Sequence, residues 1–214
     1  MLITFEGPDG SGKSTQAKLL KDRLEKDGHK VTLVHFPRYE SPIGNFINKI
    51  LKGEEKIDFK AMQMIYVADQ LDFQKELKEK LSNNEIVICD RYNISTIAFY
   101  MSHYNCSVEE AINKVYNNWQ VDLELPNLTF LLDTNGNIVS KRREEETFDI
   151  LEKDKTLMNN VAKNLKEVTK FLDTNLFLNA EYIEADDDID TISDDIYNKF
   201  NLTYGYYKNI YDQE

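Results

Sequence analysis

An eight-residue segment close to the start of the chain has the residue types and the spacing needed to bind phosphate. Residues 7–14 read G-P-D-G-S-G-K-S and match the pattern G-x-x-x-x-G-K-[ST] in full. In this pattern the glycines let successive backbone N–H groups surround a phosphate, the lysine adds a positive charge, and the hydroxyl can ligate Mg²⁺. We expect Lys13 to act in catalysis on the β- and γ-phosphates and Ser14 to ligate the metal. The predicted nucleotide-binding residues are Gly7, Pro8, Asp9, Gly10, Ser11, Gly12, Lys13, Ser14 and Thr15.

The flanking sequence gives this loop the structural context that the motif requires. Residues 2–5 are apolar or β-branched and predict a short strand that leads into the loop. After the loop, Ala17, Leu20 and Leu24 lie on one face of a predicted helix, whose N-terminus adds a positive dipole near the phosphate. A strand, a glycine-rich loop and a helix in this order make a chance glycine-rich turn a poor explanation.

Short apolar segments alternate with helical patterns along the rest of the chain. Strands are predicted at 2–5, 31–36, 86–89, 128–132 and 182–184, and helices at about 42–52, 58–81, 94–102, 107–119, 151–173 and 189–200. Such alternation is typical of βαβ units around a parallel sheet. We therefore predict an α/β protein of the P-loop NTPase fold, with a five-stranded parallel sheet, helices on both faces and a single domain over residues 1–214.

Arginine is scarce in this chain and is concentrated where predicted strands end. Five of the 26 Lys and Arg residues are arginines, and four of these five follow strands, namely Arg38, Arg91, Arg142 and Arg143. Ligands of open parallel sheets bind beyond the carboxyl ends of the strands. Arginine suits bidentate phosphate binding, so we interpret these four as phosphate-binding residues, whereas Arg23 lies mid-helix among other charged residues.

Composition restricts the class of protein and its partners. The chain has 214 residues, of which 41% are hydrophobic and 30% charged, as in ordinary globular proteins. A net charge of −12 argues against a nucleic-acid partner, and no apolar run approaches the length of a membrane span. The first strand leaves no room for a signal peptide, and Cys89 and Cys106 have no metal-site spacing and form no disulfide framework. We therefore expect a cytoplasmic protein without a membrane or nucleic-acid partner.

Three segments near the ends of predicted strands carry a family resemblance. They read F-E-G-P-D-G-S-G-K-S-T-Q at 5–16, F-P-R-Y-E-S-P-I-G at 36–44 and D-R-Y-N-I-S-T-I-A-F at 90–99. Together with the order of strands and helices, they resemble the thymidylate kinase family, whose members transfer the γ-phosphoryl group of ATP to dTMP. The resemblance covers about residues 1–200.

The resemblance has implications for substrates, cofactor and assembly. It implies ATP and dTMP as small-molecule substrates, Mg²⁺ as cofactor and a role in dTTP synthesis. It also implies a short basic lid over about 134–150. A homodimer is implied as well, in which helices from the 42–52, 58–81 and 151–173 regions pair.

The family's site residues can be carried over to matching positions of this sequence. Asp9 resembles the carboxylate that meets the 3′-hydroxyl of the deoxyribose, and Arg91 resembles the arginine that holds the acceptor phosphate. Asp90 resembles the catalytic carboxylate near the metal, although an aspartate at this position can also act as a helix cap. Phe36 and Arg38 are implied substrate-binding residues after the second strand, with Tyr39 as the alternative to Arg38. Ser95 and Phe99 resemble residues of the acceptor-pocket wall.

The resemblance further implies an arginine that meets the negative charge of the transferring phosphoryl group. In the family this arginine comes from the phosphate loop or from the lid. Residues 8–11, the variable positions of the loop, include no basic residue, so the lid must supply it. The chain thus resembles the lid-arginine bacterial type, with Arg142 or Arg143 as the catalytic arginine. Arg142 aligns better, and three glutamates at 144–146 follow directly.

The predicted helix at 58–81 carries Gln63, Tyr66, Gln70 and Gln74 on one face. In the family an aromatic residue of this helix stacks on thymine, and Tyr66 suits that role. One turn later the family usually has an arginine at the base edge, whereas this chain has Gln70, whose amide offers a donor and an acceptor without charge. The alternative is an aromatic residue in the core with the glutamines facing water.

Other functions also fit parts of the sequence. Two enzyme alternatives are a deoxynucleoside kinase and a kinase for a different deoxynucleoside monophosphate. A nucleotide-binding module without an acceptor site would explain the phosphate loop, but it would not explain the arginines at the strand ends.

Overall fold

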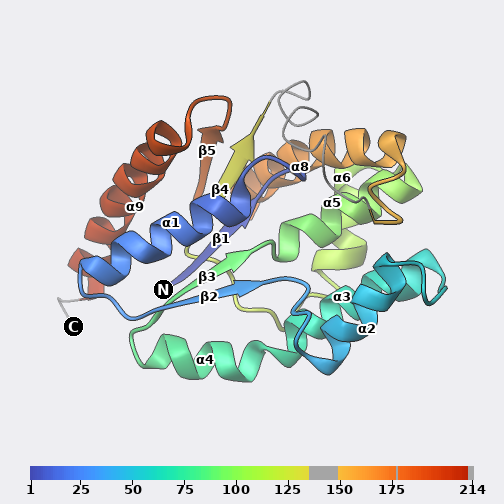
Figure 1. Ribbon diagram of the computed structural model, residues 1–214, viewed down its shortest axis with the longest axis horizontal. Helices are drawn as coiled ribbons and strands as arrows, with labels where there is room; N and C mark the ends of the chain where they lie inside the picture. Colours follow the sequence, from blue (N-terminus) through green and yellow to red (C-terminus); the bar gives the residue numbers. More distant parts are fainter. Residues whose placement is uncertain (135–148, 177, 212–214) are drawn as a thin grey trace.

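The computed structural model describes residues 1–134, 149–176 and 178–211. Its centre is a sheet of five parallel strands in the order β2-β3-β1-β4-β5 (Figure 1). The strands are β1 (Leu2–Glu6), β2 (Val31–His35), β3 (Ile86–Asp90), β4 (Leu128–Asp133) and β5 (Ala180–Glu184). The predicted α/β fold with a five-stranded parallel sheet is confirmed, and each apolar segment that predicted a strand forms one.

Helices cover both faces of this sheet. They are α1 (Lys13–Lys26), α2 (Pro42–Leu51), α3 (Phe59–Asp72), α4 (Gln74–Ser82), α5 (Asn93–Tyr104), α6 (Val108–Ala111), the π-helix η1 (Ile112–Tyr116), α8 (Lys155–Leu176) and α9 (Ile189–Tyr211). α1 and α9 pack on one face, and α4, α5 and α8 lie on the other (Figure 1). Within the described ranges, no helix combines the length and the apolar character that crossing a membrane requires.

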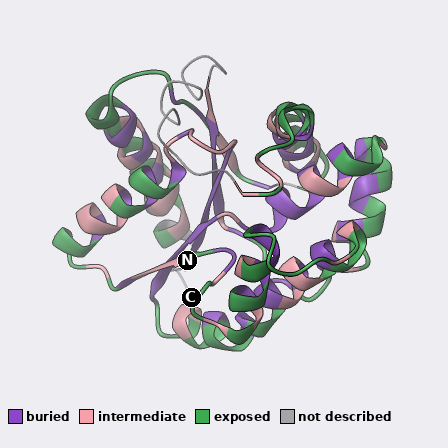
Figure 2. Ribbon diagram, turned by 45° about the vertical axis from the view of Figure 1, so that its right-hand side comes forward, coloured by how far each residue is buried: buried purple, intermediate pink, exposed green. Residues whose placement is uncertain are grey.

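Alternate residues of each strand enter opposite halves of the core. In β1, Ile3 and Phe5 pack with residues of α1 and α9, and the ring of Phe5 lies 5.2 Å from that of Phe130 in β4. Leu2 faces the other side and packs with Leu77 of α4. Every residue of β1 and β3 is buried (Figure 2), which explains why the sequence of both strands is largely apolar.

The predicted helix at 58–81 is wrong in one respect, because this segment forms two helices. α3 ends at Asp72 and α4 begins at Gln74, with Phe73 between them. The ring of Phe73 is buried and lies 5.9 Å from that of Phe36, just after β2. The break lets α3 pack against α2 and α5 while α4 covers β3. Each half keeps its own helical pattern, so periodicity alone does not reveal the break.

The predicted helix at 107–119 is shorter and less regular than its pattern indicates. Ser107 and Glu110 form a capping box that begins α6, and the chain then widens into η1. With this winding, Ile112 and Val115 are buried in the core that they share with α5 and α8. The regular helix therefore ends at Ala111, and the π-helix continues to Tyr116.

The last helix continues to Tyr211 instead of ending near residue 200. Tyr204 stacks on Phe200 at 5.2 Å and packs edge-on against His29 at 5.0 Å. Tyr204 therefore extends the helical face that packs on the protein, whereas Tyr206 is 71% exposed.

Candidate active site

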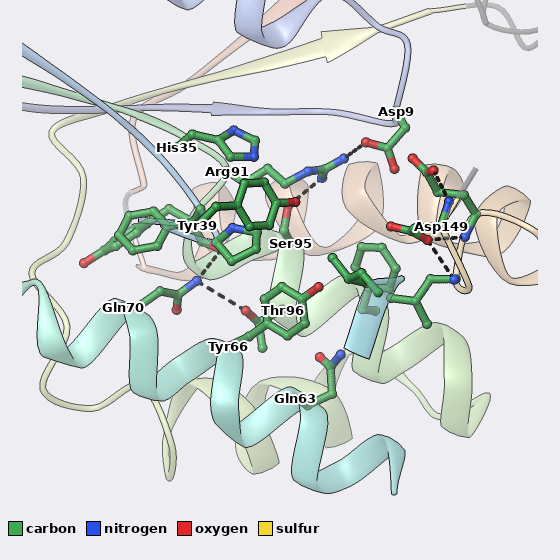
Figure 3. Close-up of a pocket in the computed structure, with 17 residues that line it drawn as sticks. Asp9, His35, Tyr39, Gln63, Tyr66, Gln70, Arg91, Ser95, Thr96 and Asp149 are labelled. Atoms are coloured by element: carbon green, nitrogen blue, oxygen red, sulfur yellow. Dashed lines mark hydrogen bonds and ion pairs between the residues drawn. The ribbon is translucent and has the colours of Figure 1, made fainter. Parts of the chain in front are cut away.

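Two adjoining cavities open at the carboxyl ends of the central strands. The first, called here the loop cavity, has a volume of about 410 Å³ and is lined by residues 10 and 12–15 of the phosphate loop together with Asp90. The second, called here the side cavity, has a volume of about 130 Å³ and is lined by residues that follow β2 and by side chains of α3 and α5 (Figure 3). Asp9, His35, Arg91 and Glu152 line both cavities.

Glycine is required in the phosphate loop where a side chain would be blocked or strained. Gly7 has φ 151°, and a Cβ atom there would lie 2.7 Å from the carbonyl oxygen of Leu132. Gly12 has φ 94° and directly precedes α1. Because α1 begins at Lys13, the positive end of its dipole lies at the loop cavity, where an anion is stabilised.

Lys13 occupies a largely buried position in the wall of the loop cavity. Its side chain is 5% exposed, and Nζ donates a hydrogen bond of 2.8 Å to the carbonyl oxygen of Pro8. Burial and the positive charge of Arg91 lower the pKa of Lys13 to about 8, although the nearby carboxylates, led by Asp9, oppose this. A bound phosphate would stabilise the protonated amine by adding negative charge beside it.

Asp90, the last residue of β3, lies against the start of α1. Ser14 donates a hydrogen bond of 2.5 Å to Oδ2 of Asp90, and Nδ1 of His35 lies 3.1 Å from the same oxygen. Burial raises the pKa of Asp90, but the hydrogen bond from His35 and the charge of Lys13 lower it by more, so the net shift is downward. The alternative that Asp90 caps a helix is not supported, because α5 begins at Asn93 and its cap residue is Tyr92.

The Ser14 and Asp90 side chains fit a hard divalent cation. Oδ1 of Asp90 is buried and has no hydrogen-bond partner in the described part of the chain. A hydroxyl and a carboxylate beside a phosphate-binding loop are the oxygen ligands that Mg²⁺ prefers. These two predicted metal ligands are therefore brought together at the loop cavity.

Arg91 follows β3 and lines both cavities, and its side chain points toward Asp9 (Figure 3). Its guanidinium donates to Oγ of Ser95 at 3.0 Å and to the carbonyl oxygen of Gly7 at 3.3 Å, and it forms an ion pair with Asp9. Burial lowers the pKa of Arg91, but Asp9 and Glu6 raise it by more, so the guanidinium stays charged. The structure thus brings together Asp9, Arg91 and Ser95, three residues that the sequence predicted for substrate binding.

Glu6 stabilises the position of Ser95, and it was not among the site residues predicted from the sequence. Its carboxylate is fully buried and accepts hydrogen bonds from Oγ of Ser95 at 2.5 Å and from the backbone N–H of Tyr92 at 2.9 Å. Burial raises the pKa of Glu6 despite these hydrogen bonds. A charged residue at the end of an otherwise apolar strand was the available signal.

Arg38 lies outside both cavities, unlike Arg91. Its guanidinium donates to Oδ1 of Asp69 at 3.1 Å and to Oδ2 of Asp72 at 2.6 Å, and its backbone N–H donates to Asp69 at 2.7 Å. Tyr39, the alternative position, does line the side cavity. Through these contacts Arg38 connects the segment after β2 to α3, so its role in this structure is structural.

This contact offers a matched pair of stability tests. Asp69 is buried, whereas the side chain of Asp72 is 54% exposed. We expect Asp69→Ala to lower the free energy of unfolding by about 1–3 kcal/mol, because the Arg38 backbone N–H loses its buried acceptor while the guanidinium keeps Asp72. Asp72→Ala should cost less than about 1 kcal/mol, since exposed ion pairs contribute little. Urea denaturation of both variants measures the difference, and equal losses would contradict a buried anchor at Asp69.

The far end of the side cavity is formed by α3 and by aromatic side chains. Gln63, Tyr66 and Gln70 reach into this region from α3, and Phe36 and Phe99 lie in the cavity wall (Figure 3). The alternative in which the glutamines face water is wrong, since Gln63 and Gln70 are each 2% exposed.

Gln70 is held in place by neighbouring groups of α5. Its Nε2 donates to the carbonyl oxygen of Tyr92 at 3.1 Å and to Oγ1 of Thr96 at 3.4 Å. Gln74 secures the same region, because its Nε2 donates to the backbone carbonyl oxygen of Gln70 at 2.9 Å. Gln70 therefore connects α3 to α5 at the cavity wall, and Gln74, the first residue of α4, connects α4 to α3.

The predicted lid lies mostly outside the described residues. Arg142 and Arg143 both fall in the segment 135–148, so their predicted roles stay predictions. Directly after this segment, Asp149 and Glu152 line the side cavity. Burial raises the pKa of Asp149, and the negative charge of Glu152 adds to this shift.

Comparisons with known proteins identify the family and agree with the fold. A family model for thymidylate kinase matches residues 5–196. A probable thymidylate kinase of Methanocaldococcus jannaschii is 33% identical over 213 residues, which cover 98% of this chain and 97% of that protein. A thymidylate kinase of Halothermothrix orenii is 38% identical over 135 residues, 62% of this chain and 64% of that protein.

A solved structure supports the same assignment. The thymidylate kinase of Candida albicans matches with a TM-score of 0.80 and 25% sequence identity, covering 94% of this chain and 92% of that chain. Sequence, fold and the arrangement of the phosphate loop beside Asp90 and Arg91 agree, and the chain belongs to the thymidylate kinase family.

Proposed function

We propose that the protein is an ATP-dependent kinase that transfers the γ-phosphoryl group of ATP to dTMP, which yields dTDP and ADP for dTTP synthesis. The observation that carries this proposal is the pair of adjoining cavities that share Asp9 and Arg91. The loop cavity takes the phosphates of ATP, and the side cavity takes dTMP. The phosphates of both nucleotides then meet beside Lys13 and Asp90.

Phosphoryl transfer depends on positioning and on charge stabilisation more than on covalent chemistry. Lys13 and the loop N–H groups hold the phosphates of ATP, while Arg91 holds the phosphate of dTMP. An oxygen of the dTMP phosphate attacks the γ-phosphorus, the bond from this phosphorus to the bridging oxygen breaks, and ADP leaves. Because Arg91 is already oriented by Asp9 and Ser95, little of its side-chain freedom is lost when the acceptor binds.

Mg²⁺ is the cofactor that we propose for the loop cavity. Ser14 and Asp90 would hold it, since they supply the hydroxyl and the unpartnered carboxylate oxygen described above. The ion supplies positive charge to the donor phosphates when bound.

The base of dTMP would lie between α3 and α5 in the side cavity. Tyr66, Phe36 and Phe99 supply the aromatic and apolar surface of this cavity, and Gln70 lies at its edge. The Nε2 group of Gln70 is already engaged by Tyr92 and Thr96, so a base contact through its amide oxygen is the one that leaves this network intact.

A coupled assay for ADP release tests the proposed function directly. We expect ATP and Mg²⁺ to support transfer to dTMP, with lower rates for dUMP, dCMP, dGMP and thymidine. Excess EDTA in parallel reactions should abolish release. Activity with thymidine alone would favour a deoxynucleoside kinase, and activity with dCMP or dGMP alone would favour a different monophosphate kinase. No release above the ATPase background with any acceptor would favour a binding module.

We also propose a homodimer that pairs through the α2 and α3 region. Phe46 of α2 is 37% exposed, and Met64 and Leu71, seven residues apart on α3, are 49% and 36% exposed. Apolar side chains at this spacing share one helix face and are suited to an interface. Light scattering should give twice the chain mass, and Met64→Glu should shift it toward the monomer, whereas Val121→Glu, at another exposed apolar site, should not. A monomeric parent protein at micromolar concentration would refute this proposal.

A reducing, cytoplasmic location fits the two cysteines. Cys89 is buried in β3 and Cys106 is partly buried, and both are free thiols. Burial raises the pKa of the Cys89 thiol, which keeps it protonated and unreactive.

A further inference from the structure

The loop cavity contains a histidine to which none of the proposed roles is assigned. His35 is the last residue of β2 and pairs in register with Asp90, the last residue of β3. Paired residues of neighbouring strands project their side chains to the same face of a sheet, so the two side chains meet at its carboxyl end. There, Nδ1 of His35 lies 3.1 Å from Oδ2 of Asp90, and the imidazole lines both cavities.

The chemistry of the pair fixes the direction of its hydrogen bond. An ionised carboxylate only accepts hydrogen bonds, so Nδ1 of His35 must carry the hydrogen and donate it to Asp90. A neutral imidazole with its hydrogen on Nδ1 is sufficient for this contact, because the second ring nitrogen takes no part in it. The contact therefore depends on a donor at the δ position of residue 35 and not on a positive charge there.

We propose that His35 is a positioning residue whose Nδ1–H holds the Asp90 carboxylate in the orientation in which Asp90 and Ser14 bind the Mg²⁺ of the metal–nucleotide complex. This inference rests on the proposed function, because the proposed kinase activity is what requires Mg²⁺ at Asp90. Both described hydrogen bonds to the Asp90 carboxylate end at Oδ2, one from Ser14 and one from His35. They leave Oδ1 without a partner among the described residues.

His35 differs from Ser14 in one respect that matters for this role. Ser14 is itself a proposed metal ligand, so its position changes with the metal that it binds. His35 reaches Asp90 from a separate strand and fixes the carboxylate to the sheet whether or not the metal is present. Removing the hydrogen-bond partner of a metal ligand typically lowers metal affinity or activity by about 10- to 100-fold.

The exposure of the two side chains separates this role from a contribution to folding. The His35 side chain is 45% exposed, whereas the Asp90 side chain is 4% exposed. An exposed imidazole adds little buried area, so replacing it should leave the thermal midpoint nearly unchanged. The effect of a substitution should appear in metal-linked nucleotide binding and in turnover.

Three substitutions separate a δ-position donor from the other properties of histidine. Asparagine places an amide N–H at the same number of bonds from Cα as Nδ1, whereas glutamine places it one bond farther out. His35→Asn therefore keeps the proposed donor, His35→Gln removes it from that position, and His35→Ala removes it altogether. Asparagine and glutamine are both neutral and polar, so they are matched controls for charge and polarity.

Nucleotide binding in the absence of turnover gives the first readout. The dissociation constant of the non-hydrolysable analogue AMP-PNP is measured by calorimetry with Mg²⁺ and with EDTA. The ratio of the two values, called here the metal gain, is the factor by which Mg²⁺ tightens nucleotide binding. We expect His35→Ala and His35→Gln to reduce this gain about tenfold or more. We expect His35→Asn to keep it within about threefold of the parent, and binding in EDTA to be similar for all four proteins.

Steady-state kinetics give the second readout. His35→Ala and His35→Gln should lower kcat by about tenfold or more, with KM for dTMP within about threefold of the parent value. His35→Asn should restore most of kcat. A packing role would not distinguish asparagine from glutamine in this way.

Three results would overturn the inference. The first is an unchanged metal gain in His35→Ala. The second is equal loss in His35→Asn and His35→Ala, which would assign the effect to the ring or its charge. The third is a rise in KM for dTMP that accounts for the loss of kcat/KM, which would assign His35 to the acceptor. If the parent protein failed to phosphorylate dTMP, the proposed function would fail, whereas the binding series would still decide the role of His35.

Discussion

Arg91→Ala is expected to lower kcat/KM for dTMP by about 10³-fold, because it removes the cation that both cavities share. The guanidinium is held between Asp9, Ser95 and the Gly7 carbonyl oxygen, so its position is set before the acceptor binds. Loss of this group should remove both affinity for the acceptor phosphate and its alignment with ATP. Steady-state kinetics with dTMP and calorimetric titration of ATP together measure the effect, and ATP affinity should change little.

The alanine variant also carries a cost in stability that must be separated from the loss of activity. Without Arg91, the buried Glu6 and the nearby Asp9 lose their main positive neighbour, which should cost about 3–5 kcal/mol of unfolding free energy. Arg91→Lys is the control, since it keeps the charge but loses the planar fork. We expect it to recover most of the stability and little of the activity. Near-parent kcat/KM in a folded Arg91→Lys or Arg91→Ala protein would contradict the proposed role.

One of the two lid arginines is expected to be essential for the chemical step. Lys13 and Arg91 are the lysine and the arginine that line the loop cavity in the described part of the chain, and Arg91 is assigned above to the acceptor phosphate. The charge on the transferring phosphoryl group therefore needs a further cation, and an arginine in this role is worth about 10³-fold or more. We expect Arg142→Ala to lower kcat to this extent with ATP binding little changed, and Arg143→Ala to be nearly neutral.

Single-turnover rates on the two variants decide between the arginines, because they report the chemical step without product release. The reverse pattern would move the assignment to Arg143. Should neither substitution slow the chemical step by more than about tenfold, or roughly 1.4 kcal/mol, the lid supplies no catalytic arginine. The resemblance to the lid-arginine type would then be wrong for this chain.

The strands could be predicted from sequence because a strand buried on both faces consists of consecutive apolar residues, which form a recognisable short segment. β1 and β3 are buried on both faces, so each is a short, nearly unbroken apolar segment. The break at Phe73 could not be predicted in this way. It depends on the packing of Phe73 against Phe36, which is distant in sequence, and α3 and α4 each keep a helical period.

The same distinction explains what could be predicted of the site. The phosphate loop is a local motif, and Arg91 directly follows a buried strand, so the placement of both at one edge followed from the topology of a parallel sheet. Arg38 also follows a strand, but α3 presents Asp69 and Asp72 to it, and no local pattern indicates that pairing. His35 was missed for a related reason, because its relation to Asp90 appears only when β2 and β3 are in register.

The buried carboxylate of Glu6 has a consequence for how this sequence can change. Glu6 and Arg91 are connected through Ser95, which donates to one and accepts from the other. Losing Arg91 alone leaves the buried Glu6 carboxylate without its positive neighbour, at about 3–5 kcal/mol out of a total that is typically about 5–15 kcal/mol. Losing Glu6 alone is less costly, because Arg91 keeps its ion pair with Asp9. An exchange of both residues that starts with Arg91 therefore passes through a barely folded intermediate, whereas one that starts with Glu6 does not. Mutational drift at this edge of the sheet is thus restricted in its order, even where the chemistry would tolerate another cation.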